Sequence, residues 1–133
     1  MEFFVNNIAL FFLIAFSGLL LLLPNRSKKI VSVKESVVLI NRQPTILVDV
    51  RNENECNLGR IDNSLNIPLD QLAENIDKLK KNPNKTIIVY CQKGFRSSQA
   101  VKILNKLGIE SAVSIEGGLD AWKKDNLPIK IDS

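Results

Sequence analysis

The sequence predicts an α/β domain, a parallel sheet with helices on both faces, preceded by one transmembrane helix. Two continuous apolar runs rich in β-branched residues, 45–50 and 85–90, are typical of strands that are buried on both faces. Each run is followed by a segment with apolar residues at helical spacing, and this alternation is typical of a parallel sheet. The transmembrane helix is predicted by a nearly continuous apolar segment, residues 3–23.

The apolar segment 3–23 is interrupted only by two asparagines and one serine. About 20 apolar residues suffice to cross the hydrocarbon core of a bilayer. A cleaved signal peptide is one alternative, but it has a basic start and a small-residue cleavage site. This chain has Glu2 near its start, and the apolar run ends at Pro24. A core helix, the other alternative, is not expected to be so uniformly apolar in a small domain. Residues 1–25 are therefore predicted to be a transmembrane anchor.

Basic residues follow the predicted span, where Arg26, Lys28 and Lys29 define a basic linker, 26–29. Lysine and arginine concentrate on the cytoplasmic flank of membrane spans. The sequence therefore predicts a single-pass membrane protein whose C-terminal domain, 30–133, lies in the cytoplasm.

Charge and composition narrow the possible functions. The chain has 18 basic and 14 acidic residues, a net charge of +4, and part of the excess belongs to the membrane flank. The domain is thus too balanced to predict nucleic acid as a partner. The chain has no histidine, which excludes a histidine base. Because it also has only two cysteines, the usual zinc-binding spacings are excluded. A cytoplasmic setting argues against a structural disulfide between Cys56 and Cys91.

The domain is expected to begin with a short strand, 30–31, and a helix. Ser32 and Glu35 form a capping-box pattern at the start of this helix, which we expect to run to about residue 41. Pro44 then ends the helical segment.

The run 45–50 is the first predicted buried strand. A polar stretch, 51–57, follows it, and then a short extended piece, 65–68, that ends in proline. Apolar residues next recur at helical spacing and predict a helix over about 70–81. This periodicity is carried by Leu69, Leu72, Ile76 and Leu79.

A turn at 82–84 leads into the second predicted buried strand, 85–90, and then into a loop, 91–96. A helix is predicted over 97–107. Gly108 stands just after this helix, a position that favours glycine.

The last predicted elements are a short strand, 112–115, and a helix introduced by Gly117 and Gly118. We expect Leu119 and Trp122 of this helix to lie in the core.

Cys91 lies where a predicted buried strand ends and a helical segment follows. Backbone N–H groups and the positive end of a helix stabilise an anion at such a junction, so we expect a lowered pKa and a reactive thiolate. The alternative is a small buried core cysteine, but the neighbouring Lys93, Gly94 and Arg96 favour the thiolate. Sites in such folds form at the carboxyl ends of the strands. We therefore expect Asp49, which also lies at a strand end, to be a neighbour of Cys91.

The loop offers further contacts. Gly94 permits a left-handed turn or close approach to a ligand. Arg96 either binds an anion or pairs with the aspartate of the neighbouring strand, and Lys93 either attracts an anionic donor or is simply solvated. Phe95 is expected to pack in the loop. Ser97 is expected to cap the following helix rather than to act in catalysis.

A cysteine nucleophile held by backbone amides can attack sulfur, phosphorus, arsenic or carbon. Four residues separate Cys91 from Arg96, which is fewer than in the loop that tyrosine-specific phosphatases wrap around a phosphate. The shorter loop is better sized for one sulfur atom than for three phosphate oxygens. Its size argues against a phosphatase and against an arsenate reductase.

Three groups of residues resemble the signatures of the rhodanese-like family, in the right order along the domain. Together with the predicted anchor, the chain is similar to small bacterial membrane-anchored members of that family, which implies a bacterial inner membrane. The three groups are Asp49-Val50-Arg51 with Glu55, Gly59, Ile61 and Asn66-Ile67-Pro68; Cys91-Gln92-Lys93-Gly94-Phe95-Arg96-Ser97; and Gly117-Gly118 with Trp122.

The resemblance implies a single-domain sulfurtransferase that needs no metal or organic cofactor. Cys91 would take a sulfane sulfur from thiosulfate or a persulfide donor, hold it as a persulfide, and pass it to a thiol or a protein cysteine. The resemblance assigns substrate binding to Gln92, Lys93, Gly94, Phe95 and Arg96, and support of the loop to Asp49, Arg51 and Ser97.

Two positions depart from the family pattern. Arg60 stands in place of a histidine that looks structural in the family, and Cys56 stands where an aromatic residue is common. We expect Cys56 to be a packing residue rather than a resolving thiol. The main alternative to an enzyme is a non-catalytic rhodanese-like module that docks a partner at the membrane. The intact Cys91 and Arg96 favour the enzyme.

Overall fold

A computed structural model describes residues 2–22 and 29–131. In this part of the chain, five strands form one parallel sheet with the order β1-β5-β4-β2-β3. The strands are β1 (Ile30–Val31), β2 (Thr45–Asp49), β3 (Leu65–Asn66), β4 (Thr86–Tyr90) and β5 (Ala112–Ile115). The helices around the sheet are α2 (Val33–Arg42), α3 (Glu53–Asn57), the 3₁₀ turn η1 (Leu69–Gln71), α4 (Ile76–Lys80), α5 (Phe95–Lys106) and α6 (Gly118–Lys124).

Helices cover both faces of the sheet. Alternate residues of a strand point to opposite sides, so one strand contacts the helices of both layers. In β4, Ile87 and Val89 belong to the cluster that contains the apolar residues of α4 and α5. Ile88 and Tyr90 belong to the opposite cluster, with the apolar residues of α2 and α6. The predicted α/β fold, a parallel sheet with helices on both faces, is confirmed.

The prediction of a single helix over 70–81 is wrong. The structure instead has the short turn η1 and then the five-residue helix α4. Between them, the side-chain amide of Asn75 donates a hydrogen bond to the carbonyl oxygen of Gln71 at 2.8 Å. An asparagine side chain that bonds the nearby backbone competes with the helical ladder. The apolar periodicity was nevertheless informative, since Leu72 and Leu79 are buried.

One helix was not predicted, and another begins earlier than predicted. The polar stretch 51–57 contains α3, which begins with a capping box in which Asn52 and Glu55 each accept the other's backbone N–H. A helix of five residues has too few turns for its periodicity to be detected. The helix α5 begins two residues before the predicted start at Ser97, because Gly94 adopts a left-handed conformation (φ +101°) and takes the N-cap position.

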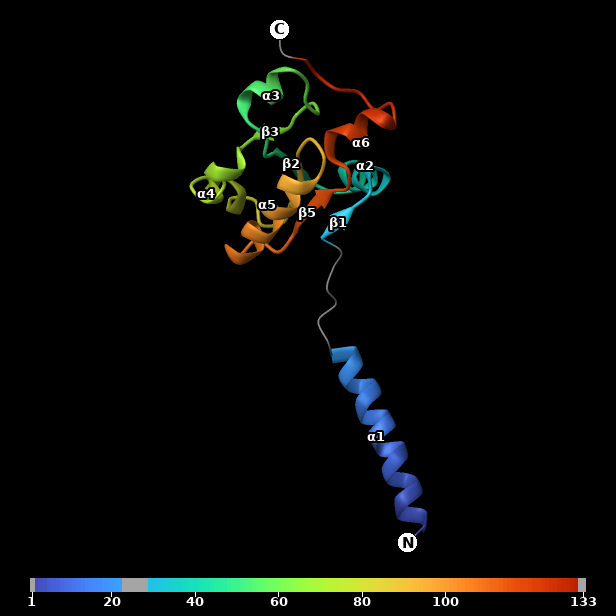
Figure 1. Ribbon diagram of the computed structural model, residues 1–133. Coiled ribbons are helices and arrows are strands. Elements are labelled where there is room, and N and C mark those ends of the chain that lie inside the picture. Colours follow the sequence, from blue (N-terminus) through green and yellow to red (C-terminus); the bar gives the residue numbers. More distant parts are fainter. Residues whose placement is uncertain (1, 23–28, 132–133) are drawn as a thin grey trace.

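The N-terminal helix α1 (Glu2–Leu22) coincides with most of the predicted anchor and lies apart from the sheet domain in Figure 1. Within the described ranges, no helix combines the length and the apolarity that crossing a membrane requires. The predicted transmembrane span over 3–23 is therefore not confirmed. Most of the predicted basic linker, 26–29, lies outside the described residues.

Candidate active site

Cys91 directly follows β4 at the carboxyl end of the sheet, and the chain then turns into α5. The N–H of Gly94 donates a hydrogen bond to Cys91 Sγ at 3.0 Å, and the N–H of Ser97 donates another at 3.3 Å. Both N–H groups belong to the start of α5, where a helix has no internal acceptors for them. The sulfur therefore lies at the positive end of a helix, an environment that stabilises an anion.

Opposing effects act on the Cys91 thiol. The residue is only 1% exposed, and burial by itself raises the pKa of a thiol. Hydrogen bonds from the hydroxyl and N–H of Ser97, and from the N–H groups of Gly94 and Lys93, act in the opposite direction. Together they outweigh burial and hold the pKa of Cys91 below its ordinary value. The site thus favours the thiolate, which is the nucleophilic form.

Ser97 faces the sulfur from the first turn of α5. Its Oγ lies 3.5 Å from Cys91 Sγ and 2.7 Å from the hydroxyl of Ser114, a buried residue of β5. The Ser97 hydroxyl also donates to the carbonyl oxygen of Gly94 at 3.2 Å, so when Ser114 donates to Ser97 the Ser97 proton has two acceptors, this oxygen and the thiolate. The prediction that Ser97 caps the helix is wrong, because Gly94 holds the N-cap position.

The thiol borders a pocket of about 260 Å³. Arg96 lines the pocket and forms a two-point ion pair with Glu55 of α3, with Nη1 2.8 Å from Oε2 and Nη2 2.9 Å from Oε1. The structure thus pairs Arg96 with Glu55 and not with Asp49, the partner considered from the sequence. The remaining residues that line the pocket are Gln92, Lys93 and Phe95.

Two of these residues lie on the surface. Phe95 is 78% exposed, so the prediction that it packs within the loop is wrong. Lys93 is also exposed. Both side chains are therefore accessible to a molecule that approaches the pocket.

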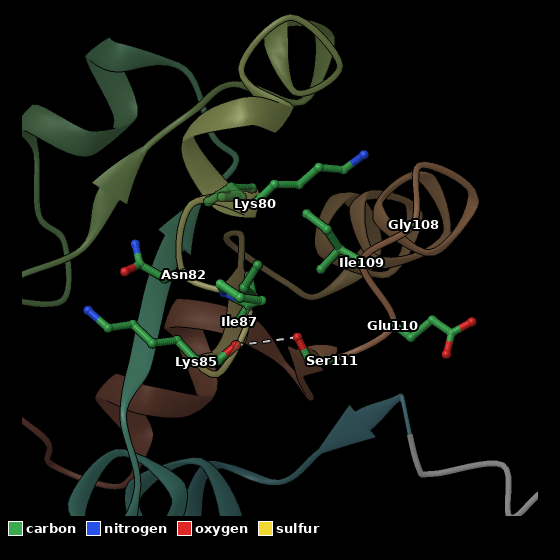
Figure 2. Close-up of a pocket in the computed structure, with 10 residues that line it drawn as sticks. Lys80, Asn82, Lys85, Ile87, Gly108, Ile109, Glu110 and Ser111 are labelled. Carbon is green, nitrogen blue, oxygen red and sulfur yellow. Dashed lines mark hydrogen bonds between the residues drawn. The ribbon is translucent and has the colours of Figure 1, made fainter.

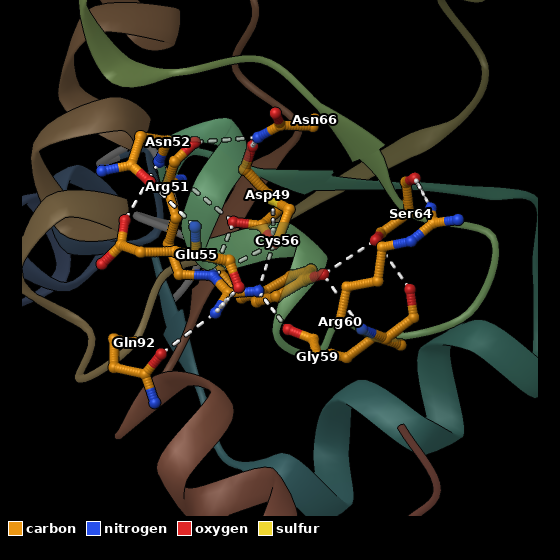
Figure 3. Close-up of polar contacts among 12 residues, drawn as sticks. Asp49, Arg51, Asn52, Glu55, Cys56, Gly59, Arg60, Ser64, Asn66 and Gln92 are labelled. Carbon is orange, nitrogen blue, oxygen red and sulfur yellow. Dashed lines mark hydrogen bonds and ion pairs between the residues drawn. The ribbon is translucent and has the colours of Figure 1, made fainter. Parts of the chain in front are cut away.

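A buried ion pair supports the loop (Figure 3). Asp49 and Arg51 are 0% and 2% exposed, and Nη2 of Arg51 lies 2.7 Å from Oδ2 of Asp49. Arg51 also donates hydrogen bonds to the carbonyl oxygen of Gly59 at 2.7 Å and to Oε1 of Gln92 at 3.0 Å. Because Gln92 directly follows Cys91, Asp49 acts on the loop through Arg51 and Gln92.

The helix α6 holds the loop from another direction. The N–H of Leu119 donates to the carbonyl oxygen of Cys91 at 2.8 Å, and the N–H of Asp120 donates to that of Gln92 at 3.1 Å. The Asp120 carboxylate also accepts a hydrogen bond from the Gln92 side chain. Gly118 is left-handed (φ +60°), and a Cβ at this position would overlap the carbonyl oxygen of Cys91. The backbone of α6 thus lies so close to the loop that only glycine, which has no side chain, fits at position 118.

The second cysteine, Cys56, is buried in α3, and its Sγ donates a hydrogen bond to Oδ2 of Asp49 at 3.1 Å. Burial, together with the bond and charge of Asp49, raises the pKa of Cys56 to about 12. This thiol therefore stays protonated at neutral pH and fits the predicted packing role. A resolving thiol acts as a thiolate.

Further contacts to the loop come from residues that the sequence did not assign to the site, among them Glu55, Ser114, Gly118, Leu119 and Asp120. The capping pattern with Asn52 is a local signal for the position of Glu55 on a helix. No local pattern indicates its ion pair, nor the contacts of Ser114 and Asp120, because each joins segments that lie far apart in the sequence.

A larger hollow of about 450 Å³ lies at the opposite, amino edge of the sheet, between the end of α4 and the turn that follows α5 (Figure 2). The hydroxyl of Ser111 donates to the carbonyl oxygen of Lys85 there, at 3.4 Å. The residues that line this hollow include neither cysteine. This hollow is therefore separate from the smaller pocket at Cys91.

The fold and the pocket define an α/β protein with a cysteine of lowered pKa at the carboxyl end of a central parallel strand. A model of the rhodanese-like domain matches residues 32–125. The chain belongs to the rhodanese-like family.

Two relatives and one solved structure show the range of similar proteins. The chain is 30% identical over 91 residues to a sulfurtransferase of Allochromatium vinosum, covering 68% of this chain and 83% of that protein. It is 30% identical over 106 residues to a tRNA uridine(34) hydroxylase of Buchnera aphidicola, covering 77% of this chain. A crystal structure of a rhodanese-related protein from Thermoplasma volcanium has a TM-score of 0.70 and 31% identity, covering 78% of this chain and 99% of that one.

The matched proteins differ in length. The chain spans 34% of the Buchnera hydroxylase and 49% of another relative, from Synechocystis. The similarity to these longer proteins therefore concerns only part of each.

Proposed function

We propose that this protein is a rhodanese-type sulfurtransferase that carries a sulfane sulfur on Cys91, from thiosulfate or a persulfide donor to a thiophilic acceptor. The observation that carries the proposal is the Cys91 sulfur itself, which borders a pocket and accepts hydrogen bonds from the N–H groups of Gly94 and Ser97. Membership of the rhodanese-like family and the similarity to a sulfurtransferase support it.

The reaction has two steps. The Cys91 thiolate attacks the outer sulfur of the donor; the sulfur–sulfur bond of the donor breaks, and its electron pair leaves with the donor remnant, which is sulfite when the donor is thiosulfate. An acceptor thiolate then attacks the outer sulfur of the Cys91 persulfide and regenerates the Cys91 thiolate. The transferred atom remains sulfane sulfur throughout, so neither an oxidant nor a reductant is needed. Two half-reactions through one covalent intermediate give ping-pong kinetics.

A non-catalytic module that docks a partner is the second candidate function. The observation in its favour is Phe95, which is 78% exposed beside the pocket. Hydrogen bonds that lower the pKa of Cys91 favour the enzyme, because a docking surface does not need a thiolate.

Incubating the full chain with thiosulfate, or with the persulfide of 2-mercaptoethanol, should add one sulfur atom at Cys91, detected by mass spectrometry of the peptide. Because the pKa of Cys91 is lowered, loading should continue below the pH at which ordinary thiols ionise, and should slow as the pH falls through the lowered value. Cys91→Ser should abolish loading, whereas Cys56→Ser, in the protonated buried thiol, should retain it. No added sulfur from either donor would favour the docking module.

We also propose that α1 holds the domain at a membrane, with the domain on the cytoplasmic side, as expected of a bacterial inner-membrane protein. Large apolar side chains of α1 are exposed, among them Phe11 at 71%, Phe12 at 72% and Leu13 at 67%. Apolar surface of this kind is unfavourable in water and favourable in lipid. The basic residues Arg26 and Lys28 follow α1 in the sequence and are suited to the cytoplasmic flank.

In fractionated bacterial cells, the full chain should sediment with the membranes. Resistance to alkaline carbonate would indicate the single-pass span expected from the sequence, and release by carbonate would indicate attachment to the surface. Leu13→Arg should weaken sedimentation, whereas Leu58→Arg, at a position on the domain that is 79% exposed, should not. A chain that stays in the supernatant before any treatment would contradict membrane attachment. In a variant that combines Asn126→Cys with Cys91→Ser, labelling by an impermeant maleimide only after permeabilisation would support the cytoplasmic side; labelling in intact cells would contradict it.

A further inference from the structure

We propose that Glu55 selects the sulfur donor: by neutralising Arg96, its carboxylate favours persulfides with at most one negative charge over dianionic thiosulfate. This inference rests on the proposed sulfurtransferase function and specifies its donor class.

Glu55 acts on the pocket through its ion pair. Both terminal nitrogens of Arg96 face a Glu55 oxygen, at 2.8 and 2.9 Å. Both residues line the pocket at Cys91. The Arg96 charge that an anionic donor would otherwise meet is therefore already countered by a carboxylate of the protein.

The Glu55 carboxylate is held in this position. Its Oε2 also accepts a hydrogen bond from the N–H of Asn52 at 3.0 Å, and Asn52 Oδ1 accepts the N–H of Glu55 at 2.9 Å. Swinging the carboxylate away from Arg96 would break the capping box that begins α3. The hydrogen bond from Arg96 also lowers the pKa of Glu55, so the group stays ionised at neutral pH.

The charges around the pocket cancel. Of the residues that line the pocket, Lys93 and Arg96 are basic and Glu55 is acidic, and Cys91 adds a second negative charge in the thiolate form that attacks the donor. A pocket with no net charge offers a dianion little attraction. Thiosulfate carries two negative charges, whereas the persulfide of an uncharged thiol carries at most one. The persulfide can be loaded with the same balance as before: the thiolate attacks the outer sulfur of R–S–SH, the S–S bond breaks, and R–S⁻ leaves while the proton stays on the new persulfide.

Glu55→Gln tests the selection, because glutamine removes the charge and can still accept the Asn52 N–H of the capping box. The matched control is Glu53→Gln, which removes the same charge from an exposed position of α3 that does not line the pocket. For each full-chain protein, rate constants for sulfur addition at Cys91 are measured with thiosulfate and with the persulfide of 2-mercaptoethanol. The ratio of the thiosulfate to the persulfide rate constant should rise about five- to tenfold in Glu55→Gln, as expected for one unit charge a few ångströms away, and should be unchanged in Glu53→Gln.

The salt dependence of the wild type gives a second measurement that needs no variant. If the pocket charges cancel, the thiosulfate rate should not fall as ionic strength rises, whereas a net positive pocket would give a steep fall. An unchanged ratio in Glu55→Gln, or a steep fall in the wild type, would overturn the selection by Glu55 while leaving the sulfurtransferase function intact. Absence of loading from both donors in the wild type would instead overturn the function, and the selection with it.

Discussion

Replacing Asp49 with asparagine should lower the free energy of unfolding by about 3–5 kcal/mol, because it leaves a buried guanidinium without its counter-charge. Asp49 and Arg51 are both almost inaccessible to solvent. Nε of Arg51 donates to both oxygens of the carboxylate, at 3.0 and 3.1 Å, in addition to the 2.7 Å contact of Nη2. An asparagine has a similar shape but supplies neither the charge nor the second oxygen. Urea unfolding of the full chain, followed by the fluorescence of Trp122, would measure the loss.

The matched control is Asp62→Asn, which breaks an ion pair that lies at the surface. Asp62 lies 3.9 Å from Lys130, and the two side chains are 67% and 54% exposed. Exposed pairs of this kind contribute little to stability, so this variant should unfold almost as the wild type does. Equal unfolding curves for Asp49→Asn and Asp62→Asn would show that burial of the first pair does not matter.

The buried pair also links the stability of the domain to its proposed chemistry. Arg51 is at once the partner of Asp49 and the donor to Gln92, the residue after Cys91. Asp49 lies opposite Tyr90 in the register of β2 and β4. The position of the ion pair is therefore fixed by the central strands β2 and β4. These buried strands also fix the position of the loop, because Arg51 binds Gln92.

The sheet could be predicted from the sequence because each central strand is one continuous apolar run. This signal lies within the run itself and does not depend on tertiary contacts. The position of Cys91 at a strand end followed from the same runs. Helix starts were less predictable. Whether Gly94 or Ser97 caps α5 depends on a left-handed glycine that the loop's tertiary contacts permit, and no local propensity specifies this conformation.

The partners of the site residues were the least predictable part. Arg96 had two plausible roles in the sequence, and its observed partner, Glu55, comes from a helix too short to be detected. Side-chain pairing between distant segments depends on how the elements pack together. Sequence patterns describe each element by itself, so they predicted Cys91 at the start of the loop but not the ion pair between Arg96 and Glu55.

Gly118→Ala should slow sulfur loading at Cys91 by about 100-fold, a loss typical of a reacting group that is displaced by about 1 Å. A Cβ at this position would overlap the carbonyl oxygen of Cys91 and lie 2.8 Å from the carbonyl carbon of Gln92. The loop must therefore move away from α6 and give up the hydrogen bond from the Leu119 N–H. Loading rates from mass spectrometry, compared with the folded fraction from Trp122 fluorescence, would measure the effect.

Gly118→Ala has two effects, strain of the left-handed backbone and a clash with the loop. Gly108→Ala is the control that distinguishes them. Gly108 is also left-handed (φ +96°), but a Cβ there would meet only the ammonium end of Lys80, at the ordinary distance of 3.7 Å. Both alanine variants bear the cost of the left-handed conformation, about 1–2 kcal/mol, whereas only Gly118→Ala displaces the loop. If the two variants, when folded, load sulfur at the same rate, α6 does not position the nucleophile. If only Gly118→Ala is slow, the close approach of the two backbones keeps the Cys91 sulfur within reach of the N–H groups that stabilise it.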